Sequence, residues 1–292
     1  MGLYTLLVDL TNIQTIKTMF KKHNLWAKKR LGQHFLVSRK ALSRVLEAAQ
    51  LKKEDTILEI GPGIGVLTSE LLPRVKNVIA IEKDNVMAEA LKENTRGFKN
   101  LRVIHGDILN LEPEKELPKD YKIVANIPYY ITSPFIRRFL EADRRPQLLV
   151  LMLQKEVAER IVAKPGKMNI LAVSVQFYAE PEIVSFVSCN SFWPKPEVDS
   201  AIIKMMPRKM MPRVSPLARG INEKEFFRIV RIGFSSPRKK LVNNLSAGFQ
   251  ISKETGADLL KKIGIESQKR PQDLSLENWI YLYKIFNEYD IL

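Results

Sequence analysis

The stretch that decides the fold is TILEIGPGIG, which occupies residues 56–65. Its first five residues are apolar or β-branched except for Glu59, so they predict a buried β-strand. The three glycines that follow permit a tight turn and the close approach of a ligand to the backbone. A dinucleotide fingerprint would place its third glycine at position 66, where this chain has Val66, and it would not carry Pro62 in the turn. The turn therefore predicts a nucleoside cofactor and disfavours NAD.

Outward from this turn, short apolar runs alternate with amphipathic stretches between residues 38 and 205. This alternation is typical of an α/β domain built on a largely parallel sheet. We expect Ser38 to cap the first helix and Asp84 to cap the helix that runs towards Asn94. Further strands are predicted at 77–82, 101–104, 122–125 and 148–153, with a closing antiparallel pair at 183–187 and 201–205.

Acidic side chains follow two of these predicted strands: Glu82 ends one and Asp107 follows the next. An ionised carboxylate accepts hydrogen bonds through two oxygens, so Glu82 is a candidate for both hydroxyls of a ribose and Asp107 for the exocyclic amine of an adenine. Ligands of open α/β sheets usually bind at these strand ends. The alternative is that both acids are helix N-caps. The order E-x-G-x-G-x-G, acid, Gly-Asp resembles the class I methyltransferases, which implies S-adenosylmethionine (SAM) as the cofactor.

The tetrapeptide Asn126-Ile127-Pro128-Tyr129 follows the strand predicted at 122–125. The exocyclic nitrogen of adenine is a weak nucleophile because its lone pair is delocalised into the ring. The side-chain carbonyl of Asn126 and a backbone carbonyl of Ile127 or Pro128 could accept both amine hydrogens and so localise that lone pair. Tyr129 could stack on the purine. These residues predict methyl transfer to an amino nitrogen; the alternative is an Asn-Pro turn that leads into a helix.

A wider set of motifs resembles, in order, the KsgA-type small-subunit rRNA adenine dimethyltransferases over about residues 25–290. The resemblance implies a Rossmann-like class I methyltransferase domain followed by a small all-helical domain. It implies methylation of two adjacent adenines in the loop near the 3′ end of small-subunit (16S) rRNA, giving N6,N6-dimethyladenosine during ribosome assembly. The motifs lie at residues 28–36, 59–65, 126–135, 153–158, 192–200 and 234–240.

The resemblance also implies roles for single residues. Phe192 would form the second face of an aromatic clamp opposite Tyr129, and His34 stands where the family often has Asn. The implied catalytic residues are Asn126, Pro128, Tyr129 and Phe192. The implied cofactor-binding residues are Gln33, His34, Leu36, Gly61, Gly63, Glu82, Asp107 and Asn126.

The positive charge of the chain is concentrated in two segments. The sequence has 47 Lys and Arg against 32 Asp and Glu, a formal net charge of +15. Residues 1–40 hold eight basic residues and one acidic, and residues 204–245 hold eleven and two, so the two segments carry the whole excess. This distribution predicts a polyanion-binding surface, and a generally solvated basic surface is the alternative. The candidate RNA-binding residues are Lys28, Lys29, Arg30, Arg238, Lys239 and Lys240.

Residues 206–219 carry three prolines and no periodicity, which predicts a linker. We therefore expect a basic N-terminal arm at 1–37, a SAM-binding domain at 38–210 and a helical RNA-contacting domain at 211–292. The helices of that last domain are predicted near 222–233, 238–247, 252–263 and 275–287.

Several classes of protein and site are disfavoured. The early apolar run is too short for a signal peptide or a membrane span. A single cysteine, Cys189, and three scattered histidines give no disulfide and no metal-ligand spacing. We expect a cytoplasmic monomer without a metal. Two other functions stay open: adenine N6 methylation of large-subunit rRNA or DNA, and nucleic-acid binding by a methyltransferase fold without catalysis.

Overall fold

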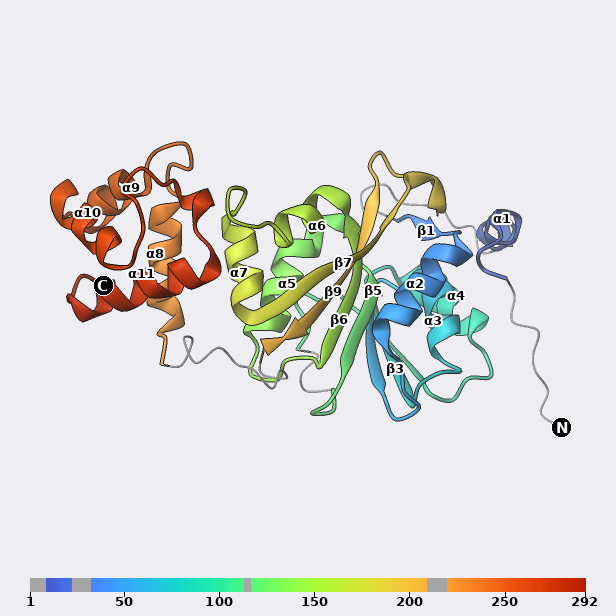
Figure 1. Ribbon diagram of the computed structural model, residues 1–292. Coiled ribbons are helices and arrows are strands. Elements are labelled where there is room, and N and C mark those ends of the chain that lie inside the picture. Colours follow the sequence, from blue (N-terminus) through green and yellow to red (C-terminus); the bar gives the residue numbers. More distant parts are fainter. Residues whose placement is uncertain (1–8, 23–32, 113–116, 209–219) are drawn as a thin grey trace. The chain divides into compact units, whose positions relative to one another are not determined.

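The structure, a computed structural model, describes residues 9–22, 33–112, 117–208 and 220–292 (Figure 1). Two compact units divide the chain. The first runs up to Ala158 and includes Pro181–Pro207, and the second combines Glu159–Glu180 with Arg208–Leu292.

The first unit is built on a seven-stranded sheet with the strand order β4-β3-β2-β5-β6-β9-β7. β2 pairs in parallel with β3 and β5, β3 with β4, and β5 with β6, whereas β9 runs antiparallel to β6. The predicted strands are confirmed to within two residues, apart from β7, which begins earlier than expected. The strands are β2 (Thr56–Ile60), β3 (Asn77–Glu82), β4 (Leu101–His105), β5 (Lys122–Asn126), β6 (Leu148–Gln154), β7 (Ala179–Val187) and β9 (Ser200–Pro207).

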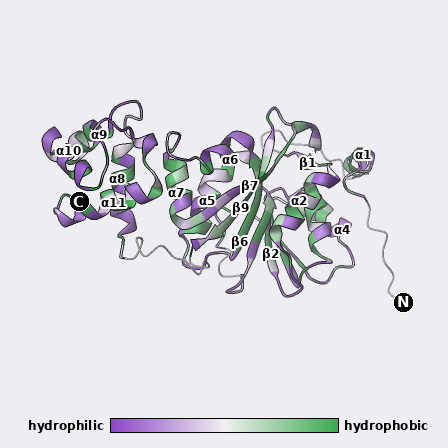
Figure 2. Ribbon diagram, viewed as in Figure 1, coloured by the Kyte–Doolittle hydropathy of each residue, from purple (hydrophilic) through white to green (hydrophobic). Residues whose placement is uncertain are grey.

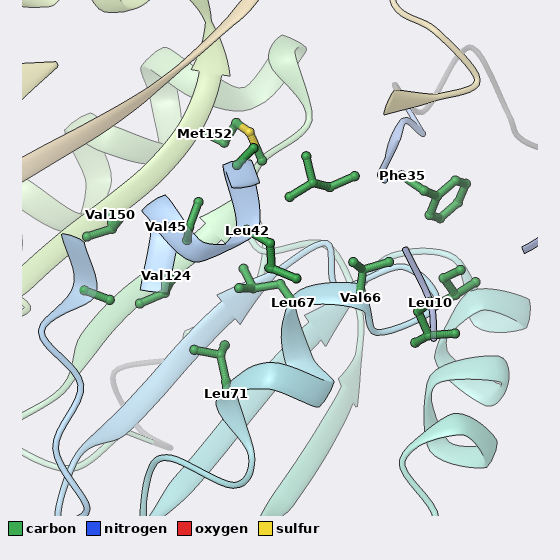
Figure 3. Packing of buried hydrophobic residues seen from close by; sticks show 14 of the residues in the cluster. Leu10, Phe35, Leu42, Val45, Val66, Leu67, Leu71, Val124, Val150 and Met152 are labelled. Atoms are coloured by element: carbon green, nitrogen blue, oxygen red, sulfur yellow. The ribbon is translucent and has the colours of Figure 1, made fainter. Parts of the chain in front are cut away.

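The central strands are buried because helices cover the sheet. All five residues of β2 are buried, and the hydrophobic colouring of the central strands is visible in Figure 2. The first covering helix, α2 (Arg39–Ala49), starts where predicted: the Ser38 hydroxyl accepts the Ala41 amide at 3.3 Å. Leu42 and Val45 of this helix join the core that Figure 3 shows. The remaining helical elements are α3 (Val66–Leu71), α4 (Asn85–Asn94), the turn η3 (Tyr129–Ile131), α5 (Thr132–Glu141) and α6 (Lys155–Ile161).

Two N-terminal elements pack onto the same core. Helix α1 (Ile13–Lys22) buries Ile16, Met19 and Phe20. Strand β1 (Phe35–Leu36) pairs antiparallel with β8 (Phe192–Trp193), with Phe35 opposite Trp193 and Leu36 opposite Phe192. The part of the expected 1–37 arm that the structure describes is therefore not a free basic tail.

The second unit is helical, with its own core. Phe226, Phe286 and Trp279 are completely buried in it. Met168 and Ala172 belong to the same cluster, which is why residues 159–180 group with the C-terminal helices and not with the 38–210 domain that the sequence suggested. The helices are α7 (Ile170–Tyr178), α8 (Glu223–Gly233), α9 (Leu241–Phe249), α10 (Lys253–Lys262) and α11 (Leu276–Glu288).

In the described part of the chain, no helix is both long and apolar enough to cross a membrane.

Candidate cofactor and base-binding site

A pocket lies at the carboxyl ends of β2, β3, β4 and β5, where the sequence motifs were expected to meet. Parallel strands end at one edge of a sheet, so motifs that are distant in the sequence come together there. Ten predicted site residues line the pocket: Gln33, His34, Leu36, Gly61, Gly63, Glu82, Asp107, Asn126, Pro128 and Tyr129.

The glycine turn forms the floor of the pocket, and two of its positions exclude a side chain. Gly61 and Gly63 have φ angles of +63° and +58°, a region that residues with a Cβ rarely adopt. A Cβ on Gly61 would lie 3.3 Å from Cδ of Pro128, and one on Gly63 would lie 2.9 Å from Cε1 of Phe35. Glycine therefore lets the turn pack closely against Pro128 and Phe35.

Glu82 is fixed by the backbone on both of its carboxylate oxygens. Its Oε2 accepts the Gly63 amide at 3.0 Å, and its Oε1 accepts the Asp84 amide at 2.9 Å. Only 7% of the residue is exposed, and burial raises the pKa of its carboxyl. The N-cap of α4 is Asp84, so the alternative of Glu82 as a helix cap is wrong. Each oxygen retains lone-pair capacity for a ribose hydroxyl.

Asp107 is more exposed than Glu82 and is held by two partners. Its Oδ2 forms an ion pair with Lys83 at 2.7 Å, and its Oδ1 accepts the Leu109 amide at 3.0 Å. The hydrogen bond from Lys83 holds the pKa of Asp107 below its usual range. The carboxylate is thus charged and oriented at the edge of the pocket, where it can accept an amine hydrogen.

Sequence reasoning missed the residue that holds the loop after Asp107. Arg138 of α5 donates through Nη1 to the backbone oxygens of Ile108, at 2.7 Å, and Leu109, at 2.9 Å, and through Nη2 to that of Leu111. Three carbonyls of one loop therefore share one guanidinium. A single Arg on an amphipathic helix carries no sequence signal for such a contact.

Asn126 ends β5 with its side chain anchored at the nitrogen. Its Nδ2 donates to the backbone oxygen of His34 at 3.2 Å, which leaves the side-chain oxygen Oδ1 as an acceptor. The Ile127 amide donates to the Met152 oxygen at 3.3 Å, so the start of the tetrapeptide is tied to β6. These two bonds fix the backbone that carries the proposed acceptors for an amino group.

Tyr129 lies beside the same pocket with its hydroxyl bound. That hydroxyl is 2.8 Å from Oγ of Ser200, and partial burial raises the pKa of the phenol. The His34 ring is nearly parallel to the Tyr129 ring, with the centroids 6.3 Å apart and an interplanar angle of 23°. Nδ1 of His34 lies 2.7 Å from the Pro194 oxygen, which holds the ring in place.

Phe192, the expected second face of the clamp, is not brought into the pocket. It is 4% exposed and belongs to the hydrophobic core, because its strand β8 pairs with β1. An aromatic residue that was not predicted, Tyr130, lines the pocket and is 53% exposed. The sequence alone shows that Phe192 is aromatic, but it does not show whether the side chain points into the pocket or into the core.

Glu59 adds an uncharged acid to the pocket lining. It is 2% exposed, and its Oε2 accepts the Thr68 hydroxyl at 2.7 Å. Burial, together with the charge of Glu82, raises the pKa of Glu59 to about 8. Within the described ranges no three His, Cys, Asp or Glu side chains are grouped as a metal site.

The predicted basic residues of the second unit lie on exposed loops. Arg238, Lys239 and Lys240 precede α9, whereas Lys28, Lys29 and Arg30 fall outside the described residues. The Leu241 amide donates to the Lys269 oxygen at 2.8 Å, which places a second basic loop beside the first. The Gly166 amide donates to the Gln272 oxygen at 2.8 Å, which adds a third. We call these the three basic loops; their exposed basic residues are Arg238, Lys239, Lys240, Lys269, Arg270, Lys164 and Lys167.

Comparison with solved structures gives the class of the fold. A dimethyladenosine transferase from Plasmodium falciparum superposes with a TM-score of 0.75 at 30% identity, covering 88% of this chain and 98% of that one. The 23S rRNA methyltransferase ErmE superposes with a TM-score of 0.71 at 29% identity, covering 87% and 99%. The predicted class I methyltransferase fold with C-terminal helices is confirmed.

Comparison of sequences is more specific. "Ribosomal RNA small subunit methyltransferase A" of Dehalococcoides mccartyi is 45% identical over 274 residues, which is 93% of this chain and 92% of that protein. The protein of the same name from Clostridium botulinum is 40% identical over 280 residues, 94% and 99%. The family model described as "Ribosomal RNA adenine dimethylase" matches residues 24–288. The chain therefore belongs to the ribosomal RNA adenine dimethylase family.

Proposed function

We propose that this chain transfers methyl groups from SAM to the N6 amino groups of two adjacent adenines in the 3′-terminal hairpin loop of small-subunit rRNA. The observation that carries the proposal is that Asn126, Pro128 and Tyr129 line the same pocket as the Glu82 carboxylate. The names of the relatives from Dehalococcoides and Clostridium support the small subunit as the substrate. The proposed setting is the cytoplasm during ribosome assembly, with the chain acting as a monomer.

The strand ends would hold the cofactor. Glu82 would accept the ribose hydroxyls, Asp107 would accept the adenine amine, and the backbone of Gly61 would pack directly against the ligand. The backbone-anchored carboxylate of Glu82 and the positive φ angles of the glycine turn beside it fit this group. When bound, SAM supplies an electrophilic methyl group on a sulfonium sulfur.

Asn126 and its neighbours would prepare the amine. Oδ1 of Asn126 and the backbone oxygen of Ile127 or Pro128 would accept the two amine hydrogens, so that the nitrogen lone pair points at the methyl group. Tyr129 would stack on the target base, and the nearly parallel His34 ring lies beside it, with the centroids 6.3 Å apart. Transfer of the methyl group from the sulfonium sulfur would leave a cationic methylated amine held by these acceptors, and that amine would release its proton to water. No general base is needed.

The three basic loops would hold the RNA. Exposed Lys and Arg side chains bind phosphates without reading the sequence, so they would position the RNA while the pocket selects the atom. The loops come from three parts of the second unit, which suits a folded RNA better than one continuous strand.

The decisive experiment uses labelled SAM with three substrates: undermethylated small subunits, large subunits and DNA. We expect label in the small subunit, on two adjacent adenines that chemical mapping or mass spectrometry identifies. Label in large-subunit rRNA would favour the second candidate, which the similarity to ErmE supports. No transfer to any substrate by folded protein would overturn the proposal.

The variant Asn126→Ala tests the role of the amide. It should lower the rate of methyl transfer by at least about 100-fold, the usual effect of losing one preorganised polar group, while RNA binding in a filter assay is unchanged. Asn126→Asp keeps an acceptor oxygen but loses the donor to His34, so it should retain part of the turnover. Undiminished turnover in Asn126→Ala would contradict the amine-polarising role.

A further inference from the structure

Helix α1 precedes the residues that the family model matches, yet it is built into the core. The family match begins at residue 24, and α1 spans Ile13–Lys22. Ile16 is completely buried and Phe20 is 6% exposed, both in the same cluster as Phe35. Lys22 forms an ion pair with Glu93 of α4. The helix is therefore a fixed part of the first unit.

Phe20 contacts both strands of the β1–β8 ribbon. Its ring lies edge-on to Phe35, with centroids 5.3 Å apart, and edge-on to Trp193, with centroids 5.2 Å apart. Phe35 and Trp193 are opposite each other in the ribbon. A ribbon of two residues per strand is not stable alone, so packing from Phe20 must contribute to keeping the two strands together.

Two chains of contacts lead from this ribbon into the pocket. Phe35 packs on Gly63, and the Gly63 amide donates to the Glu82 carboxylate at 3.0 Å. On the other strand, Trp193 precedes Pro194, whose oxygen lies 2.7 Å from the His34 ring nitrogen.

The second chain continues through the backbone. The oxygen of His34 accepts Nδ2 of Asn126 at 3.2 Å. Phe20 is therefore connected by contacts to both Glu82, the proposed ribose acceptor, and Asn126, the proposed amine-binding residue, although it does not line the pocket itself.

We propose that Phe20 is a positioning residue for SAM: α1 holds the β1–β8 ribbon closed against the glycine turn, so that the segment Gln33–Leu36 keeps the cofactor in the pocket. The inference rests on the proposed placement of SAM in this pocket. If the ribbon is closed for only a fraction of the time, the apparent Kd rises by the inverse of that fraction. Loss of the ring should therefore weaken SAM binding and leave the chemical step intact.

The test compares Phe20→Ala with Ile13→Ala in the full-length protein. Ile13 is on the same helix and is 39% exposed, so its variant is the matched control. For Phe20→Ala we expect the Kd and KM for SAM to rise by about ten-fold, since a closed fraction of one tenth gives that factor. At saturating SAM, kcat should equal that of the wild type. Hydrogen exchange should accelerate at the ribbon residues 35–36 and 192–193 in the absence of SAM.

Two further variants keep the outcomes distinguishable. Phe20→Leu preserves most of the packed volume and should give a smaller rise in Kd, which also covers the case in which Phe20→Ala does not fold. Glu82→Gln should weaken SAM binding if the cofactor lies in this pocket. Weaker binding in Glu82→Gln with an unchanged Kd in folded Phe20→Ala or Phe20→Leu would overturn only the positioning role. An unchanged Kd in Glu82→Gln would instead overturn the placement of the cofactor.

Discussion

Burial keeps the side chain of Glu59 mostly uncharged near pH 7, because its pKa is raised to about 8. The folded protein therefore holds a proton that the unfolded chain, with a pKa near 4.5, has lost. The stabilising contribution of this group is complete below the unfolded pKa and is lost as the pH rises towards 8. A neutral Glu59 adds no negative charge beside the glycine turn.

The variant Glu59→Gln tests this titration. Gln is uncharged at every pH and can still accept a hydrogen bond from the Thr68 hydroxyl. The free energy of unfolding of the variant should therefore not show the decrease with rising pH that Glu59 causes in the wild type. Between pH 5 and pH 8 the wild type should lose stability relative to the variant by up to about 1.4 kcal/mol per pH unit. Urea unfolding at a series of pH values measures the free energy of unfolding of the wild type and of the variant. Parallel stability curves would show that Glu59 titrates normally.

The sequence predicts the strand of Glu59 but not its protonation. Four apolar or β-branched residues, interrupted only by Glu59, precede a glycine turn, and this local signal predicted β2 at the residues that it occupies. The pKa of Glu59 depends on the burial of the side chain and on Glu82, which lies in another strand. No local pattern contains that information.

At the level of elements, α5 connects the two halves of the pocket. The helix follows the Asn126–Tyr129 motif, and its Arg138 holds the three carbonyls of the loop after Asp107. A movement of this helix would change the Asp107 side and the Tyr129 side of the pocket together. Hydrogen bonds of a charged donor contribute about 1.5–3 kcal/mol, so Arg138 should contribute substantially to the position of the loop.

We therefore expect Arg138→Ala to raise the KM for SAM by about ten-fold, equivalent to about 1.4 kcal/mol, with little change in kcat at saturating SAM. Arg138→Lys can donate to fewer carbonyls and should give an intermediate KM. The neighbouring Arg137 pairs with Glu141 on the exposed face of the same helix, so Arg137→Ala is the control. Steady-state kinetics with varied SAM measure all three. A KM that rises equally in the control would mean that helix stability, not loop position, is responsible.

The pairing of β1 with β8 and the packing of α1 were not predicted from the sequence, and both depend on contacts between distant residues. Phe20 contacts Trp193, and the buried Phe192 lies opposite Leu36, which is distant from it in the sequence. Local periodicity predicts where a helix or strand begins and ends, but not which other segment it contacts. The acids at the strand ends were predictable because parallel strands bring their ends together in any sheet of this class.

At the scale of the whole molecule, the chain forms two units, and each unit consists of two separate segments of the sequence. In the sequence, residues 159–180 lie between two segments of the first unit, yet their core contacts are with the C-terminal helices. We predicted one domain boundary, at the proline-rich stretch 206–219. The chain passes from one unit to the other there, but it also does so after Ala158 and after Glu180, which we did not predict. For the same reason the sequence identified one of the three basic loops: backbone bonds between distant residues join the second loop to the first and the third loop to the second.

If the three basic loops form one RNA-binding surface, Lys269 and Arg270 belong to it as much as Lys239 and Lys240. Replacing Lys269 and Arg270 by Gln should weaken binding to an rRNA fragment. It should also flatten the dependence of log K on log salt by about 0.7–0.9 for each phosphate that is no longer neutralised, because fewer counterions are released. The control is the pair Lys253→Gln and Lys261→Gln, which removes the same charge from exposed positions of α10. Titrations at several salt concentrations measure the slopes. Equal slopes for the two double variants would mean that net charge alone attracts the RNA, and a lower slope only for Lys269 and Arg270 would locate the RNA at the loops.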